Sequence, residues 1–317
     1  MSNLPVAVSL HELTSAYGFP GEHPFSTQRL AVFWEAACLQ GLNDLLMILP
    51  VNPVTEEDLL RFHTAPYVER VKALSAIGEG YLDEGDTPVF PHMFEASTMV
   101  VGSVITAAKA MMAGKVNLAF VPIGGLHHGF RDRAAGFCVF NDIGVVIEVL
   151  RQQYQVQTIL YVDIDAHHGD AVYYSYEEDP NVIIVDIHED GRFLYPGTGS
   201  LDERGKGPAQ GTKINLPLQP GAKNEDFFLA WEQAIRFMEC FSPDFVICQC
   251  GVDGLRGDPL THLNYTAVVH QEVTRFLLDY SKRKCQGRLL ALGGGGYALE
   301  NIAKGWTTIL KTMIEEG

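Results

Sequence analysis

Two aspartates and a histidine stand at alternate positions in one short segment. Asp163, Asp165 and His167 follow the apolar run 158–162, and alternate side chains share one face on an extended strand end. Asp165 and His167 can then reach one cation, and Asp253 from a neighbouring strand end could supply a third ligand. Two aspartates and one histidine leave a fourth position open, as in a catalytic zinc site. Such a cation polarises a carbonyl and lowers the pKa of bound water toward about 7.

A pair of adjacent histidines is the second candidate for chemistry. His127 and His128 follow two glycines, whose backbone freedom allows both side chains to project into one pocket from an irregular turn. Asp163 and Asp170 are expected in the same pocket. An aspartate bonded to one ring nitrogen fixes the tautomer of an imidazole and tunes its basicity. A His–Asp pair of this kind is a credible general acid and base; the alternative is a structural or surface histidine pair.

Four consecutive glycines precede the third candidate, Tyr297. The run 293–296 fits neither GxGxxG nor GxxxxGK[ST], so a nucleotide-binding loop is disfavoured. The glycines are better suited to bringing the backbone close to the site and aiming the hydroxyl of Tyr297. A phenol that donates to a developing oxyanion beside a metal is a plausible electrophile.

These candidates follow strands that alternate with helices. Apolar runs predict strands over 4–10, 116–121, 158–162, 181–185, 214–218, 245–250 and 288–292, and helices over 66–77, 93–113, 141–153, 171–177, 225–240, 264–280 and 297–314. A further helix capped by Ser26 or Thr27 should run to Leu39, and a short one should start at Thr55.

Continuous apolar strands that alternate with helices indicate an α/β fold with a central parallel sheet flanked by helices. Polar or glycine clusters follow five of these strands. Ligand sites in such sheets lie beyond the carboxyl ends of the strands, so we expect the active site at the C-terminal ends of the strands. No linker or charge run divides the chain, which predicts one catalytic domain over residues 1–317.

The composition disfavours nucleic acids and membranes as partners. Of the 317 residues, 23 are Lys or Arg and 39 are Asp or Glu, which gives a formal net charge of −16. Such a surface repels phosphate backbones and anionic membranes. There is no signal-like N-terminus or apolar run near 18 residues, and the six cysteines form no CxxC pair. We therefore expect a soluble, cytoplasmic protein with reduced core thiols.

Six ordered motifs extend these observations. They are Gly124-Gly-Leu-His-His, Gly136-Phe-Cys-Val-Phe-Asn-Asp, Tyr161-Val-Asp-Ile-Asp-Ala-His-His-Gly-Asp, Tyr195-Pro-Gly-Thr-Gly, Gly251-Val-Asp-Gly-Leu-Arg-Gly-Asp-Pro and Gly293-Gly-Gly-Gly-Tyr. Together they resemble the zinc-dependent histone deacetylase family, within the arginase–deacetylase superfamily. The resemblance runs from His23 to Trp306, and the segment from His188 is most similar to bacterial acetoin-utilisation-type deacetylases and histone deacetylase-like amidohydrolases.

The resemblance implies an arginase/deacetylase-like fold and an enzyme that hydrolyses the amide of acetyl-lysine, or of a longer acyl-lysine, in proteins or peptides. One Zn²⁺ per chain would be bound by Asp165, His167 and Asp253. By the same resemblance K⁺ would sit behind the zinc, on a set of residues that comprises Asp163, Asp165, His167, Asp186 and Ile187.

The catalytic roles also follow from the resemblance. His128, oriented by Asp170, would act as general base and then as general acid. His127, paired with Asp163, would stay mainly electrostatic, and Tyr297 would stabilise the tetrahedral oxyanion. The implied substrate-binding residues are Asp86 at the rim, Gly136, Phe137 and Tyr195 along the acyl-lysine tunnel, Leu260, and Arg29 at an inner product channel.

Three residues depart from the family pattern. Asp186 stands where many relatives have serine, which affects the expected preference for K⁺. Tyr195 stands where the tunnel wall is often phenylalanine and so adds a hydroxyl. Leu126 stands where several members carry a larger residue, which allows a wider acyl pocket.

Three other functions remain as alternatives. The enzyme could deacetylate a small molecule such as an acetylpolyamine, because a negatively charged protein suits any cationic substrate. An arginase-like dimanganese ureohydrolase would need more bridging carboxylates than the single Asp253 after the late strand. A non-catalytic acyl-lysine-binding protein would be expected to have lost a ligand, a histidine or the tyrosine.

Overall fold

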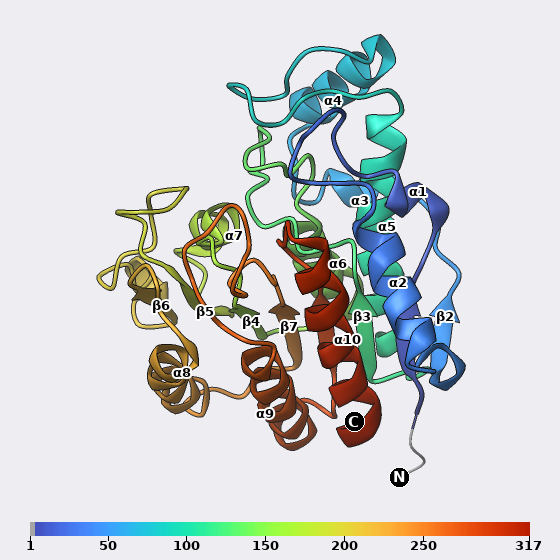
Figure 1. The fold of residues 1–317 in the computed structure, drawn as a ribbon. Coiled ribbons are helices and arrows are strands. Elements are labelled where there is room, and N and C mark those ends of the chain that lie inside the picture. The colour runs from blue at the N-terminus through green and yellow to red at the C-terminus, as the bar shows by residue number, and fades with distance from the viewer. Residues whose placement is uncertain (1–3) are drawn as a thin grey trace.

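One parallel sheet of eight strands runs through the structure (Figure 1). The computed structural model describes residues 4–317. The strand order is β2-β1-β3-β8-β7-β4-β5-β6, and every neighbouring pair is parallel. The strands are β1 Val6–Ser9, β2 Leu46–Leu49, β3 Leu118–Val121, β4 Ile159–Asp163, β5 Val182–Glu189, β6 Lys213–Leu218, β7 Phe245–Gln249 and β8 Leu289–Leu292. The predicted α/β fold with a central parallel sheet is thus confirmed.

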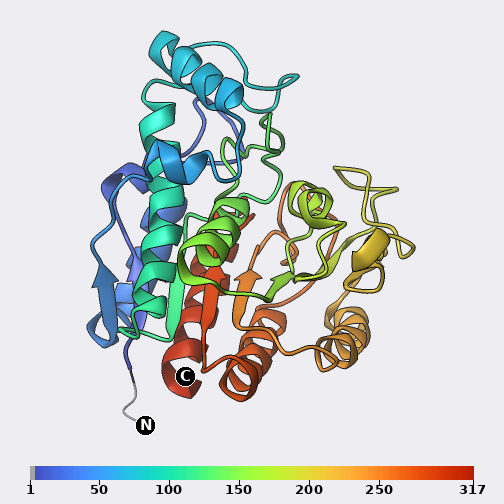
Figure 2. The same ribbon diagram turned by 180° about the vertical axis from the view of Figure 1, so that it is seen from behind.

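Helices cover both faces of this sheet (Figures 1 and 2). The helices α2, α10, α9 and α8 form one layer, and α5 and α6 lie on the opposite face. Every residue of β4 and β7 is buried, as expected for strands covered on both sides. The helices are α1 Glu12–Ser15, α2 Arg29–Leu39, α3 Glu56–Leu59, α4 Ala65–Ile77, α5 Met93–Met112, α6 Asp142–Tyr154, α7 Asp170–Tyr176, α8 Asn224–Met238, α9 Val268–Lys284 and α10 Leu299–Glu316, with 3₁₀ turns at Asn43–Leu45 and Gly207–Ala209.

Two predicted elements have ends that differ by four residues. The strand β5 continues to Glu189 instead of stopping at residue 185, because β6 pairs with it as far as Glu189 and Leu218. The helix α9 starts at Val268 instead of residue 264. The main-chain N–H of Asn264 donates to the carbonyl of Ala222, so this part of the chain is bound to the turn before α8 and cannot begin a helix.

Several smaller expectations were wrong. Neither Ser26 nor Thr27 caps α2; its N-cap is Gln28, whose N–H donates to Ser26 Oγ at 3.1 Å. The sequence pattern also missed β2 and α1, which are only four residues long. All six cysteines are free thiols, but Cys38 and Cys240 are exposed and do not belong to the core.

The five strands followed by polar or glycine clusters are neighbours in the sheet. They form the continuous block β3-β8-β7-β4-β5. Because all are parallel, their carboxyl ends lie at one edge, and the segments after them converge there. Between residues 4 and 317, the helices are either too short or too polar to span a bilayer.

Candidate active site

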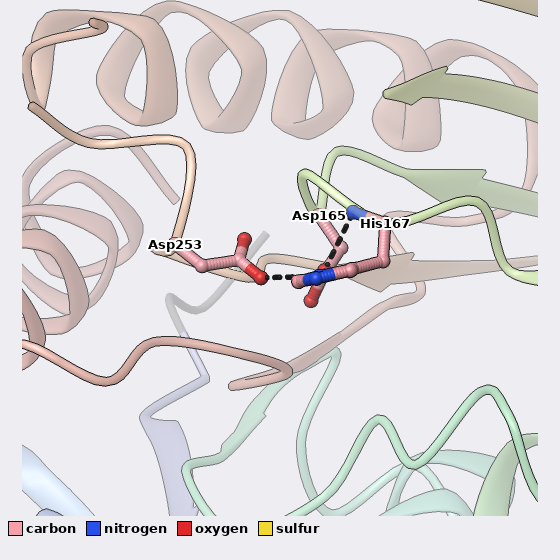
Figure 3. A group of neighbouring side chains, drawn as sticks. All are labelled: Asp165, His167 and Asp253. Atoms are coloured by element: carbon pink, nitrogen blue, oxygen red, sulfur yellow. Dashed lines mark hydrogen bonds and ion pairs between the residues drawn. The ribbon is translucent and has the colours of Figure 1, made fainter. Parts of the chain in front are cut away.

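The side chains of Asp165, His167 and Asp253 converge at this edge (Figure 3). Each offers one ligand atom, and these atoms all lie within 4.8 Å of one another. Nδ1 of His167 lies 3.1 Å from Oδ1 of Asp165 and 2.8 Å from Oδ2 of Asp253. All three residues are buried. Two carboxylates and an imidazole nitrogen form a donor set that suits a divalent transition metal such as Zn²⁺.

The strand pairing explains why residues so distant in sequence meet. β4 and β7 are neighbours, with Asp163 opposite Gln249, so the segments that follow them emerge side by side. The expected extended strand end was wrong, however, because β4 stops at Asp163 and the chain bends over residues 165–167. The bend is held by Ala166, whose N–H donates to Asp253 Oδ1 at 2.8 Å.

Two further donors orient the Asp165 carboxylate. Gln249 Nε2 and the N–H of Gly295 both donate to Oδ2 of Asp165, at 2.7 and 2.8 Å. Its Oδ1 therefore faces His167. A Cβ added to Gly295 would lie 2.6 Å from Asp253 and 2.7 Å from Asp165, so the glycine is needed for this close approach of the backbone.

The charges of the three groups favour a bound cation. Burial and the negative charge of Asp165 raise the pKa of Asp253 to about 7. Burial opposes ionisation of Asp165 as well, but His127 and His167 outweigh it and hold the pKa of Asp165 well below its ordinary value. Two buried carboxylates this close repel one another, and a divalent cation between them would offset that repulsion.

Each of the tandem histidines has an aspartate partner. Nδ1 of His127 lies 2.8 Å from Oδ2 of Asp163, and Nδ1 of His128 lies 2.7 Å from Oδ1 of Asp170. The two rings are 4.0 Å apart between centroids. Within residues 4–317, no hydrogen bond engages Nε2 of His128. That nitrogen is therefore available to a reacting molecule.

The two histidines differ in their affinity for a proton. Burial alone lowers the pKa of an imidazole, but the charges of Asp163 and Asp165 outweigh it and raise the pKa of His127 to about 10. At His128, burial and the positive charge of His127 outweigh Asp170 and lower the pKa to about 4. The pair thus consists of a charged imidazole beside a neutral one that can accept a proton.

Tyr297 lies near His167, one of the three converging residues. Its ring is 6.5 Å from the ring of His167 and 5.9 Å from that of Phe137. Burial and the nearby Asp253 raise the pKa of the phenol, so it stays protonated and can donate a hydrogen bond. Below it Arg29 is buried, and its guanidinium donates to the carbonyls of Gly294 and Gly296.

Three of the predicted substrate-binding residues line one surface pocket of about 690 Å³. Asp86, Gly136 and Tyr195 all belong to it. The ring of Tyr195 lies 5.1 Å from that of His128, so the pocket leads toward the histidines. Gly136 has a φ of +51°, and a Cβ there would lie 2.5 Å from the His128 ring.

Two other predicted residues, Phe137 and Leu260, are not among those that line this pocket. Phe137 contacts His23 and Tyr297 with its ring, and no aromatic contact joins Phe137 to Tyr195 within the described part of the chain. Leu260 is half-buried in the loop between β7 and α9, and its N–H donates to Asp258 Oδ1 at 3.0 Å.

Two of the residues predicted to hold K⁺ are neighbours across β4 and β5. Asp163 and Asp186 face one another in the strand register, and both are buried with Ile187. Asp186 lies inside β5 rather than after it. Its carboxylate accepts the N–H of Gly169 at 2.9 Å and lies 2.5 Å from Nδ1 of His188.

Two residues of this region received no role from the sequence. Asp142, at the start of α6, accepts the N–H groups of Gly125 and Leu126 at 2.7 Å each and so fixes the turn before the histidines. Gln249 orients Asp165, as described above. A polar residue within the apolar run 245–250 was the available signal for Gln249, and the Asn-Asp pair that begins α6 was the signal for Asp142.

Known proteins resemble this chain in both sequence and fold. Residues 23–313 match the model of the histone deacetylase domain. The acetoin utilization protein AcuC of Bacillus subtilis is 38% identical over 307 residues, which cover 94% of this chain and 79% of that protein. AcuC of Staphylococcus aureus (strain MSSA476) is 33% identical over 309 residues, with 95% and 79% covered. The crystal structure of the HDA15 HD domain superposes with a TM-score of 0.91 at 28% identity, covering 99% of this chain and 89% of that one.

Proposed function

The chain belongs to the histone deacetylase family, and we propose that it is a zinc-dependent deacylase that hydrolyses the amide of acetyl-lysine or a longer acyl-lysine. The observation that carries this proposal is the meeting of Asp165, His167 and Asp253 beside a His128–Asp170 pair. The ligand set supports a catalytic metal with an open position. The free Nε2 of His128 supports proton transfer next to it.

In the proposed reaction, different residues of the site carry out different steps. Zn²⁺ held by the three ligands would polarise the acyl carbonyl and acidify a water molecule beside it. His128 then takes a proton from the attacking water at Nε2, while Asp170 holds its Nδ1. The hydroxyl of Tyr297 donates a hydrogen bond to the acyl oxygen as it becomes an oxyanion. His128 returns the proton to the leaving nitrogen as the C–N bond breaks, and the products are a carboxylate and a free amine.

The remaining residues bind the substrate and a second ion. Asp86 would hold the substrate backbone or amine at the rim, and Gly136 and Tyr195, which line the same pocket, would line the path of the acyl-lysine. The resemblance to the family adds Phe137 and Leu260 to this path. Arg29 would line the inner product channel. K⁺ would bind near Asp163 and Asp186, where two buried carboxylates face one another. The names of the bacterial relatives suggest acetoin utilization as the biological setting.

A panel of acyl substrates tests the proposal. Purified protein loaded with Zn²⁺ is assayed against acetyl-, butyryl-, octanoyl- and myristoyl-lysine peptides and acetylated polyamines, with a chelator control. We expect cleavage of at least one acyl-lysine peptide, its loss with chelator and its return with Zn²⁺. Faster cleavage of the polyamines would assign a small-molecule substrate instead, and no cleavage of any acyl amide would refute the proposal.

The number of metal ions separates this site from a dimanganese centre. Elemental analysis should find about one transition metal per chain in the wild-type protein. The variant Asp253→Asn should lose most of it, whereas Asp202→Asn, at an exposed loop position, should retain it. Two equivalents of metal would favour the ureohydrolase alternative.

A further inference from the structure

Asp258 is neither a metal ligand nor part of a His–Asp pair, but its carboxylate joins two segments of the site. It lies five residues after Asp253 in the turn that follows β7, and only 8% of it is exposed. Its Oδ1 accepts the N–H of Leu260 at 3.0 Å. Its Oδ2 accepts the N–H groups of Tyr297 and Ala298 at 2.8 and 3.4 Å. Three main-chain donors from two distant segments therefore converge on one buried carboxylate.

The start of α10 has no side-chain cap of its own. The N-cap residue of the helix is Ala298, and an alanine side chain cannot accept a hydrogen bond from the first turn. The carboxylate of Asp258 lies just before this turn, where it accepts the N–H groups of Tyr297 and of Ala298 itself. Its negative charge is also favourable at the N-terminus of an 18-residue helix.

Other contacts keep the same two segments in register. Asn301 Nδ2 in the first turn of α10 donates to the carbonyl of Leu255 at 3.2 Å. The N–H of Val252 donates to the carbonyl of Gly295 at 2.9 Å. A Cβ added to Gly305 would lie 2.5 Å from Val252. The turn that carries Asp253 and the start of α10 thus pack closely, and Asp258 provides the charged contact between them.

We propose that Asp258 is a positioning residue that fixes the hydroxyl of Tyr297 relative to the metal ligand Asp253. This inference rests on the proposed function, in which Tyr297 donates to the oxyanion. The N–H that Asp258 holds belongs to Tyr297 itself, so a shift of this backbone carries the phenol with it. A displacement of about 1 Å at a reacting group can cost on the order of 100-fold in rate.

The variant Asp258→Asn tests this role with little change in shape. The amide keeps one acceptor oxygen, but its NH₂ group must face one of the main-chain donors. We expect kcat to fall roughly 10- to 100-fold, with KM and zinc content nearly unchanged. The matched control is Glu300→Gln, which removes a carboxylate from the first turn of the same helix. Glu300 is exposed and has no salt bridge within the described residues, so its loss should leave kcat unchanged.

A double-mutant cycle with Tyr297→Phe separates positioning from general destabilisation. If Asp258 acts through the Tyr297 hydroxyl, Asp258→Asn should lower kcat less than about twofold further once that hydroxyl is absent. An equal fold-loss in the wild-type and Tyr297→Phe backgrounds would overturn the proposal.

Amide hydrogen exchange provides a readout that needs no substrate. The segment 293–302 should exchange faster in Asp258→Asn than in wild type or Glu300→Gln, and wild-type exchange in Asp258→Asn would overturn the proposal. The wild-type protein could also fail to cleave any acyl amide while the segment still exchanges faster in Asp258→Asn. That result would refute the deacylase function but would still show that Asp258 holds this segment in place. If Asp258→Asn does not unfold cooperatively, Asp258→Glu is used instead, because it shifts the carboxylate by only one methylene. Unchanged kcat and unchanged exchange in Asp258→Glu would then count against the proposal.

Discussion

Oδ1 of Asp170 lies 2.7 Å from Nδ1 of His128, and both residues are buried. Because Asp170 occupies this nitrogen, the opposite ring nitrogen is the one left for the proton transfer that we propose. The fixed tautomer distinguishes His128 from a histidine that is merely close to Asp165, His167 and Asp253.

Replacement of Asp170 by asparagine tests this orientation. The amide has the size of the carboxylate but cannot stabilise a charged imidazole, so kcat should fall by about 10²–10⁴. Zinc content should not change, since Asp170 contacts none of the three ligands directly. The control Asp202→Asn removes an exposed aspartate. Wild-type kcat in Asp170→Asn, measured with the best acyl-lysine peptide, would exclude His128 as the proton carrier.

The rim gives a prediction for pH dependence. Partial burial and a hydrogen bond with the Asp83 carboxyl raise the pKa of Asp86 to about 7. Asp86 is therefore protonated below about pH 7 and ionised above it. If the ionised carboxylate binds the substrate backbone or amine, KM for an acyl-lysine peptide should fall about tenfold as the pH rises through 7.

Two variants check that assignment. Asp83→Asn removes the neighbouring carboxylate and should move the inflection in KM to lower pH. Asp86→Asn should abolish the inflection and keep KM at its high value throughout. A KM profile that is the same in Asp86→Asn and wild type would mean that another group causes the inflection.

The glycine loop gives a prediction for metal affinity. A Cβ at residue 295 would lie within 2.7 Å of the carboxylates of Asp165 and Asp253. Gly295→Ala must therefore displace a ligand, and its affinity for Zn²⁺ should fall about 10- to 100-fold, as measured by competition with a chelating dye. A melting temperature of the metal-free variant near that of metal-free wild type would show that the effect is local, and unaltered affinity would contradict the described packing.

A buried lysine far from the site gives a prediction for stability. Lys213 has no exposed surface, and its ammonium donates to the carbonyls of Asp179 and Val182 at 2.7 Å each and to Thr212 Oγ1 at 2.8 Å. Lys213→Met removes the donor that these three acceptors share, so the free energy of unfolding should fall by about 1–3 kcal/mol.

Denaturant-induced unfolding measures this change. The control is Lys206→Met, because Lys206 is exposed and paired only with Glu177 at the surface; its effect should stay within about 0.5 kcal/mol. Equal stability of Lys213→Met and Lys206→Met would show that the buried ammonium contributes nothing to the fold.

The sequence predicted the parallel sheet and the convergence of the site because both depend on local signals. Continuous apolar strands and polar residues after them are visible without any tertiary information. The strand order cannot be seen in the sequence. Neither the adjacency of β4 and β7 nor the pairing that extends β5 to Glu189 could therefore be predicted from it. Four-residue elements such as β2 are too short for periodicity to reveal.

Gln249 and Asp258, which hold other residues of the site in place, could not be predicted for a related reason. The bond of Gln249 to Asp165 spans 84 residues, and the bond of Asp258 to Tyr297 spans 39. Nothing in their own neighbourhoods indicates those partners. Asp165 and His167, in contrast, stand two positions apart, and that spacing alone was enough to suggest a shared cation.

The strand order also dictates when the centre can exist during synthesis. β7 and β8, the last strands to leave the ribosome, lie in the middle of the sheet, between β2-β1-β3 and β4-β5-β6. A nascent chain that ends before residue 245 therefore contains two three-stranded flanks with no strand pairing between them. Asp253 follows β7, which pairs with β4, so the carboxylate of Asp253 can meet Asp165 and His167 only after β7 has been added to β4-β5-β6. β8 then completes the sheet by pairing with both β7 and β3.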